Sequence, residues 1–156
     1  MKSELLLDEV NRQILIALQE NARLSYTELG RRVGLTAPAV AERIRRLEEA
    51  GVIRGYRIEI DLGRIGLPLM AFVRIATGSV SCEEFVAIAR EIPEVLECHR
   101  VTGEDSCVLK VAVQSVHHLE TLLNRLTIHG RTVTSIILSS PITGRVIDPF
   151  ALHPAP

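Results

Sequence analysis

The chain has 156 residues, of which 47% are hydrophobic, and a formal net charge of −1. This apolar content excludes wholesale disorder, and the length fits one ordinary domain or two small ones. No apolar run approaches the roughly 20 residues that a bilayer-spanning helix needs, and the N-terminus lacks a signal-peptide pattern, so we expect neither a membrane protein nor a secreted one.

The first helix is expected to begin at Asp8, whose short carboxylate suits the N-cap position. Its apolar stripe consists of Val10, Ile14, Ala17 and Leu18, which recur at helical spacing. This helix can pack against the two that follow and complete a three-helix core.

Two short helices joined by a glycine turn are predicted between Ser25 and Gly51. Ser25 can cap the first of them, and Glu28 three residues later completes a capping box. Gly34 stands where the chain must turn, because glycine adopts a positive φ without steric cost. Thr36 is then expected to cap the second helix. A helix-turn-helix of this kind is built to place its second helix in a DNA groove.

The second helix has an apolar face, formed by Val40, Ile44 and Leu47, and a charged face opposite to it. Arginines on such a face reach phosphates or the O6/N7 edge of guanine, and Glu42 can accept from cytosine or orient an arginine. The alternative is that the charged side chains form only a solvated set of salt bridges. The residues expected at a DNA interface are Thr36, Pro38, Ala39, Glu42, Arg43, Arg45, Arg46 and Arg54.

Beyond the helix pair, the run GVIRGYRIEID predicts extended chain, as a short hairpin or wing followed by an outgoing strand. Arg54 and Arg57 in this run either touch the DNA backbone or are ordinary strand-edge charges. The segment 61–68 holds two glycines and a proline, and it is the expected hinge between domains.

The second half of the chain predicts the order βαββαβ, with a helix after Ser81, a helix after Ser115 and a polar turn between the middle strands. The predicted strands are 69–77, 95–102, 107–113 and 132–140. This order is the ferredoxin-like plan, an antiparallel sheet with both helices on one face. We therefore expect an α+β protein whose parts are a winged helix-turn-helix at 1–60, the hinge at 61–68, the βαββαβ domain at 69–145 and an irregular tail or docking arm at 146–156.

Three segments resemble the Lrp/AsnC (feast/famine) family of transcription regulators: LDEVNRQILIALQENARLS, VGLTAPAVAERIRRLEEAGVIRGYRIEID and ECHRVTGEDSCVLKV. The resemblance covers residues 5–145 and implies a sequence-specific regulator that binds double-stranded DNA. It also implies that the βαββαβ (RAM-type) domain binds a small effector, usually an amino acid, and pairs protomers through their sheets. Homodimers that assemble to octamers, in the cytoplasm at the nucleoid, are the expected form.

The resemblance places the effector between dimers, beside the turn Gly103-Glu104-Asp105-Ser106. Other positions near the family's pocket match Val116, Ser135, Ile136 and Ile137. This chain departs from the family pattern, because the acidic residue that helps to hold the ligand's amino group is Ser106 here and the following tyrosine is Cys107. Asp105 or Glu104 can supply the carboxylate instead, or the effector is different or absent. Without the resemblance, GEDS is only a polar turn.

Two alternatives from other classes stay open. One is a DNA-architectural protein that needs no effector. The other is an enzyme similar to siroheme decarboxylases, which would use histidines such as the adjacent His117 and His118; on a helix these two point about 100° apart and make a poor paired site. The odd number of cysteines, without CxxC spacing, predicts free thiols in a reducing compartment and no zinc motif. We expect no catalytic residue, metal or cofactor.

Overall fold

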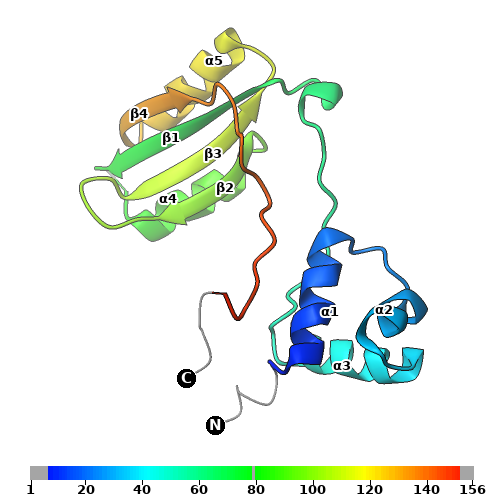
Figure 1. Ribbon diagram of the computed structural model, residues 1–156. Coiled ribbons are helices and arrows are strands. Elements are labelled where there is room, and N and C mark those ends of the chain that lie inside the picture. Colours follow the sequence, from blue (N-terminus) through cyan, green and yellow to red (C-terminus); the bar gives the residue numbers. More distant parts are fainter. Residues whose placement is uncertain (1–6, 79, 152–156) are drawn as a thin grey trace. The chain divides into compact units, whose positions relative to one another are not determined.

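The computed structural model describes residues 7–78 and 80–151, which belong to two compact units (Figure 1). The first unit contains the chain up to Glu59 together with the segment that begins at Ile142, and the second unit is Ile60–Pro141. Among the described residues, no helix is long and apolar enough to cross a membrane.

The first unit is a bundle of three helices: α1 (Glu9–Glu20), α2 (Tyr26–Val33) and α3 (Ala37–Glu49). The Asp8 carboxylate caps α1 by accepting from the Asn11 N–H, as predicted. The predicted apolar stripes are also confirmed, since the core of the bundle is built from residues of all three helices. This core consists of Ile14, Ala17, Leu29, Val40 and Ile44.

The turn between α2 and α3 is closely packed. Ser25 and Glu28 form the predicted capping box, and Gly34 ends α2 with a φ of 71°. Gly30 was not singled out by the sequence, yet a Cβ there would lie 2.4 Å from the Leu35 carbonyl oxygen. The chain can therefore fold back onto α2 only because this position has no side chain. Thr36 occupies the N-cap position of α3, but its side chain makes no capping hydrogen bond, so that part of the prediction is wrong.

The predicted wing and outgoing strand are also wrong, because residues 51–61 form neither helix nor strand. The segment is instead anchored to the end of α3: the N–H groups of Val52 and Ile53 donate to the Leu47 carbonyl at 2.9 and 3.1 Å. Ile58, farther along, has 82% of its surface exposed. A strand needs a neighbour to accept its hydrogen bonds, and none of the described strands lies in this unit. Residues 61–68 contain one short 3-10 helix, Gly63–Ile65.

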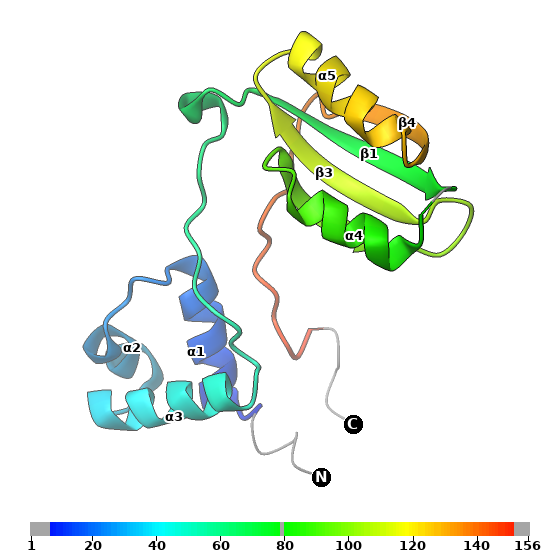
Figure 2. The same ribbon diagram turned by 180° about the vertical axis from the view of Figure 1, so that it is seen from behind.

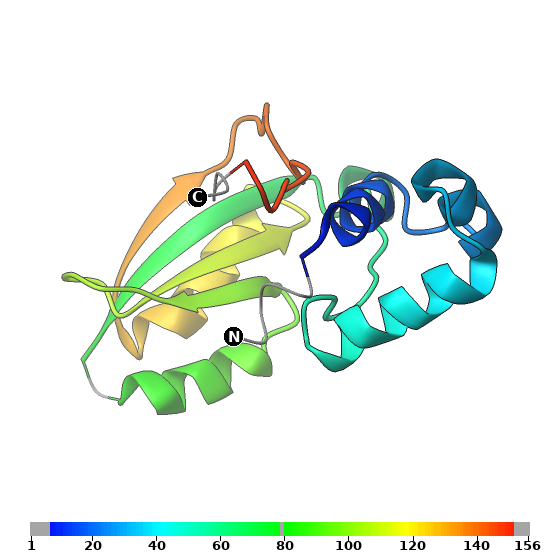
Figure 3. The same ribbon diagram turned by 60° about the horizontal axis from the view of Figure 1, so that its bottom comes forward.

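The second unit confirms the ferredoxin-like βαββαβ fold. Its strands form one antiparallel sheet in the order β2-β3-β1-β4, and both helices cover the same face of it (Figures 2 and 3). The elements are β1 (Leu69–Thr77), α4 (Cys82–Arg90), β2 (Val95–Arg100), β3 (Cys107–Val113), α5 (Val116–Thr127) and β4 (Gly130–Ile136). The last strand thus starts and ends earlier than the predicted 132–140.

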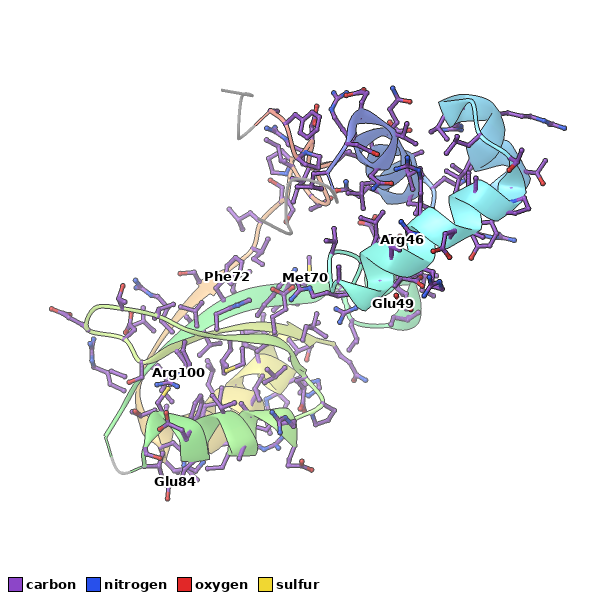
Figure 4. All side chains as sticks on the ribbon, turned by 90° about the horizontal axis from the view of Figure 1, so that it is seen from below. Arg46, Glu49, Met70, Phe72, Glu84 and Arg100 are labelled. Atoms are coloured by element: carbon purple, nitrogen blue, oxygen red, sulfur yellow. The ribbon has the colours of Figure 1, made fainter. Side chains whose placement is uncertain are left out.

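The two faces of the sheet differ because side chains alternate along each strand. On β1, Ala71, Val73 and Ile75 are fully buried against the helices. Met70 and Phe72 point to the side away from α4 (Figure 4), and 43% of the Phe72 surface is exposed. One face of the sheet therefore has no helix on it and carries a large aromatic side chain.

Candidate nucleic-acid interface and effector loop

The outer face of α3 carries the charged side chains that the sequence predicted there. Arg45, Arg46 and Glu49 are exposed, while Val40, Ile44 and Leu47 on the opposite face are buried (Figure 4). Thr36 and Pro38 are exposed at the N-terminal end of the same helix, and Ala39 is half-buried. The amphipathic spacing therefore turns a row of arginines towards solvent.

Carboxylates on the same face hold these arginines. Glu42 accepts from Arg45 Nε at 2.9 Å, from Arg45 Nη2 at 2.7 Å and from Arg46 Nε at 2.8 Å. Glu49 accepts from the remaining arm of Arg45. The hydrogen bonds from Arg45 and then Arg46 lower the pKa of Glu42 to about 2. Glu42 is therefore ionised at neutral pH and orients both guanidinium groups.

This network has a direct chemical consequence. Exposed ion pairs contribute little to stability because water and salt screen them. Phosphate oxygens, in contrast, accept bidentate hydrogen bonds from arginine as well as a carboxylate does. On chemical grounds, the two arginines can therefore exchange Glu42 and Glu49 for phosphate oxygens at small cost.

Arg43 lies on another side of α3 and is used inside the bundle. Its Nη1 donates to Asp8 at 2.6 Å and to Asn11 at 3.0 Å, which fastens α3 to the start of α1. Burial raises the pKa of Asp8, but the Asn11 N–H and the Arg43 guanidinium outweigh it and leave that pKa below its usual value. Among the residues expected to touch DNA, Arg43 is thus the one with a structural task.

Arg54 and Arg57 lie in the segment that follows α3, and both are exposed. They line a hollow of about 720 Å³ between this segment, α1 and the C-terminal tail. Tyr56 in the same segment donates to Glu48 at 2.9 Å; burial, followed by this hydrogen bond, raises its pKa to about 12. The segment is therefore fastened to α3 while its arginines stay available.

The C-terminal tail docks on α1, a contact that no local pattern in the sequence revealed. Ile147 and Gln19 exchange two hydrogen bonds of 2.9 Å. Asp148 accepts from Arg12 Nε at 2.8 Å and from Arg12 Nη2 at 2.6 Å, and the Phe150 ring lies 5.6 Å from the same guanidinium carbon. We call these contacts the tail clasp.

The loop 103–106 lies at one end of the sheet, between β2 and β3. Gly103 has a φ of 112°, and Glu104 is exposed. Ser106 is tied down: its N–H donates to the Ile75 carbonyl at 2.7 Å, and its hydroxyl accepts from the Thr77 N–H at 3.1 Å. Ser106 therefore fixes the base of the loop.

Arg74 is a candidate that the sequence reasoning missed. It lies on the helix-free face of the sheet, and its Nε is 3.8 Å from Asp105 Oδ2. An amino acid carries a carboxylate and an ammonium group, so it needs one partner of each charge. Arg74 and Asp105 supply both partners side by side, and only the sheet register, which brings the loop next to the end of β1, could have indicated this.

The remaining effector candidates lie farther along the sheet from the loop. Cys107, next to the loop, pairs with Ile75, whereas Ser135 and Ile136 pair with Phe72 and Ala71, three and four residues away along β1. Val113, shortly before Val116, pairs with Leu69, six residues away. At the usual rise of a strand these separations are roughly 10 to 20 Å, so Ser135, Ile136, Ile137 and Val116 are set apart from loop 103–106 within one chain.

The histidines in the described part of the chain do not gather into a site. His99 pairs with Glu97, and His118 pairs with Glu94, both at 3.0 Å. His153 lies outside the described residues. In the described part of the chain, no group of three or more His, Cys, Asp or Glu side chains is arranged to hold a metal ion.

Two family models match separate parts of the chain. Residues 7–48 match the AsnC-type helix-turn-helix domain, and residues 70–147 match the Lrp/AsnC ligand binding domain. The HTH-type transcriptional regulator YezC of Bacillus subtilis is 42% identical over 134 residues, which are 86% of this chain and 95% of that protein.

Among the solved structures similar to this chain, two contain a bound amino acid. A transcriptional regulator from Neisseria meningitidis in complex with L-methionine has a TM-score of 0.84 and 31% identity, over 92% of this chain and 97% of that one. A feast or famine regulatory protein from Mycobacterium tuberculosis complexed with L-methionine has a TM-score of 0.85 and 37% identity, over 92% of this chain and 99% of that one.

Proposed function

Because this chain belongs to the Lrp/AsnC family of transcriptional regulators, we propose that the outer face of its α3 binds double-stranded DNA and that an amino acid modulates this binding. The observation that supports the DNA site is the row formed by Arg45 and Arg46, exposed and oriented by Glu42. Two such helices in a dimer would enter successive major grooves about 34–36 Å apart.

The contacts divide into two kinds. Arg45 and Arg46, with the exposed N-terminal end of α3 at Thr36 and Pro38, are the proposed contacts in the groove. Arg54 and Arg57, which stand outside the helix, are the proposed contacts to the phosphate backbone and carry no sequence information. Arg43 is not a proposed DNA contact; its ion pair with Asp8 holds α3 against the start of α1.

The helix-free face of the sheet is the proposed dimer surface. It exposes Phe72 on β1. Polar side chains lie near it on the same face, such as Arg74 on β1 and Ser135, which pairs with Phe72 from β4. Aromatic side chains are enriched at protein–protein interfaces, which supports this face as the pairing surface. We propose that two copies pair through this face and that such dimers assemble further, to octamers.

The proposed effector site lies between copies of the chain. Within one chain, the strand register sets Ser135, Ile136 and Val116 roughly 10 to 20 Å along the sheet from loop 103–106, and a second copy would bring the two groups together. Arg74 and Asp105 are the proposed partners of the amino acid's carboxylate and ammonium groups. The L-methionine complexes of the relatives support an amino acid as the ligand class.

A gel-shift titration tests this function as a whole. The protein is titrated onto DNA from its own upstream region at fixed ionic strength, with each of the twenty amino acids added in turn. We expect sequence-specific binding, and a change in affinity with at least one amino acid. Specific binding that no amino acid alters would favour the effector-independent architectural role, and no binding at all would refute the assignment of α3. We also propose that the protein acts at the chromosome, in the cytoplasm at the nucleoid, and that it is not an enzyme.

A further inference from the structure

The three cysteines, widely separated in the sequence, meet between the sheet and α4. Cys82 is the first residue of α4, Cys98 lies in β2 and Cys107 begins β3. The sulfur atoms of Cys82 and Cys107 are 3.3 Å apart, and Cys98 also contacts Cys107 through a thiol hydrogen bond. All three are free thiols. The cluster lies on the helix-covered side of the sheet, away from the proposed dimer surface.

The members of the cluster differ in access to solvent. Cys107 is fully buried, whereas Cys82 is only partly buried in the first turn of its helix. Burial raises the pKa of Cys98 and raises that of Cys107 to about 12. Cys98 is also only partly buried, but its sulfur lies beside Cys107 and burial raises its pKa. Since the thiolate is the reactive form of cysteine, Cys107 and Cys98 are poor first targets for an oxidant, and the partly exposed Cys82 at the start of α4 is the entry point.

We propose that Cys82 and Cys107 form an oxidation site at which a peroxide is reduced and a disulfide closes between α4 and β3. Cys82 loses its proton to water, and its sulfur attacks one peroxide oxygen; the O–O bond breaks, leaving a sulfenic acid on Cys82 and, with hydrogen peroxide, one water. The Cys107 sulfur then attacks the Cys82 sulfur, the S–O bond breaks, and the hydroxyl departs with the Cys107 proton as a second water. Two thiols and one hydrogen peroxide thus give one disulfide and two waters.

A disulfide between Cys82 and Cys107 would change the conformation of the neighbouring loop 103–106. Cys82 Sγ donates to the Ser106 carbonyl at 3.9 Å, and Ser106 precedes Cys107 in the chain. Disulfide formation removes this donor and draws the first turn of α4 towards β3, at the point where Ser106 fixes the base of loop 103–106. Oxidation would therefore change effector binding; this consequence rests on the proposed function, whereas the disulfide itself does not.

Thiol mapping of the full-length protein tests the disulfide. Reduced protein is treated with hydrogen peroxide, free thiols are alkylated, and the peptides are identified by mass spectrometry without reduction. We expect an intramolecular Cys82–Cys107 bridge, one alkylated thiol at Cys98 and full reversal by dithiothreitol. C98S should form the same bridge, and C82S should form none and keep its thiols; C82S alters a partly exposed helix-start position, where serine is well tolerated. A bridge that includes Cys98, or oxidation of Cys82 that stops at sulfinic or sulfonic acid, would overturn the proposal.

Calorimetric titration of amino acids into the reduced and the bridged protein tests whether the disulfide changes effector binding. We expect the affinity to differ several-fold between the two forms, and not to differ in C82S after the same treatment. Equal affinities would overturn the link to the loop. If neither form bound any amino acid while the bridge formed, the effector role would fail and the oxidation site would stand.

Discussion

Arg12 on α1 holds Asp148 through two hydrogen bonds of 2.8 and 2.6 Å, although 136 residues separate the two along the chain. Arg12 is thereby the centre of the tail clasp, since its guanidinium also makes a cation–π contact with the Phe150 ring. Between these two residues the chain builds the whole second unit. The DNA-binding unit is therefore made from both ends of the sequence.

Removal of the clasp should free the tail. In Asp148→Ala the bidentate acceptor of Arg12 is lost, and we expect faster hydrogen–deuterium exchange of the amides in 146–151. Glu9→Gln is the matched control, because Glu9 is the other partner of Arg12 and lies within α1 itself. Unchanged exchange in Asp148→Ala, or equal effects in the two variants, would contradict the clasp.

Acid should release the tail as well. The hydrogen bonds from Arg12 hold the pKa of Asp148 at about 2, below its ordinary value of 3.8. Because the folded-state pKa is the lower one, the clasp stabilises the folded tail fully above about pH 4 and loses that contribution as the pH falls towards 2. Tail exchange across this range, expressed relative to the intrinsic exchange rate at each pH, should rise in the wild type and stay flat in Asp148→Ala. A wild-type profile without that rise would refute the interpretation.

Loss of an arginine on the outer face of α3 should weaken DNA binding. We expect Arg45→Ala and Arg46→Ala each to cost about 1–3 kcal/mol if the side chain reads a base, or to reduce the salt slope by about one if it contacts a phosphate. Gel shifts at several salt concentrations separate the two cases. Arg64→Ala is the control, since Arg64 is an exposed arginine outside α3 that pairs with nearby Asp61. An affinity equal to wild type in both α3 variants would refute this face as the interface.

The helix-free sheet face should control assembly. Phe72→Glu places a charge on that face and should shift the protein to monomers in sedimentation experiments, because a buried unpaired charge is costly. Asn124→Glu adds the same charge on an exposed position of α5, on the other side of the sheet, and should leave assembly unchanged. If Phe72→Glu remained a dimer, the pairing surface would have to lie elsewhere.

Arg74 and Asp105 should be needed for the amino-acid response and not for DNA binding. Arg74→Ala and Asp105→Asn are expected to lower effector affinity at least tenfold in calorimetry, while gel shifts without effector stay unchanged. Glu104→Gln distinguishes the two neighbouring acids, because Glu104 is exposed whereas Asp105 lies beside Arg74. If the amino-acid response were lost in Glu104→Gln but kept in Asp105→Asn, Glu104 and not Asp105 would be the partner of the ammonium group.

Local chemistry explains what the sequence could predict. The Ser25–Glu28 capping box and the buried alternation of Ala71, Val73 and Ile75 depend only on near neighbours, and both are confirmed. The wing at 51–61 was wrong for the opposite reason: alternating apolar residues favour extended chain, but a strand also requires a partner.

The features that the sequence did not reveal are products of tertiary structure. Gly30 matters because another segment approaches it, and Arg74 meets Asp105 because β1 lies beside β3. The three cysteines show no motif spacing because the fold, and not the local chain, brings them together. Separation along the chain is thus the common reason for these omissions.

The tail clasp also sets an order of events during synthesis. Residues up to Glu59 leave the ribosome first and can form their three helices, but Asp148 is made only after β4 of the second unit. Domains generally fold as they emerge, N-terminal first, so the clasp closes last. A nascent chain therefore carries an unclasped helix-turn-helix until its second unit has been translated, and truncation by a premature stop would leave it in that unfinished state.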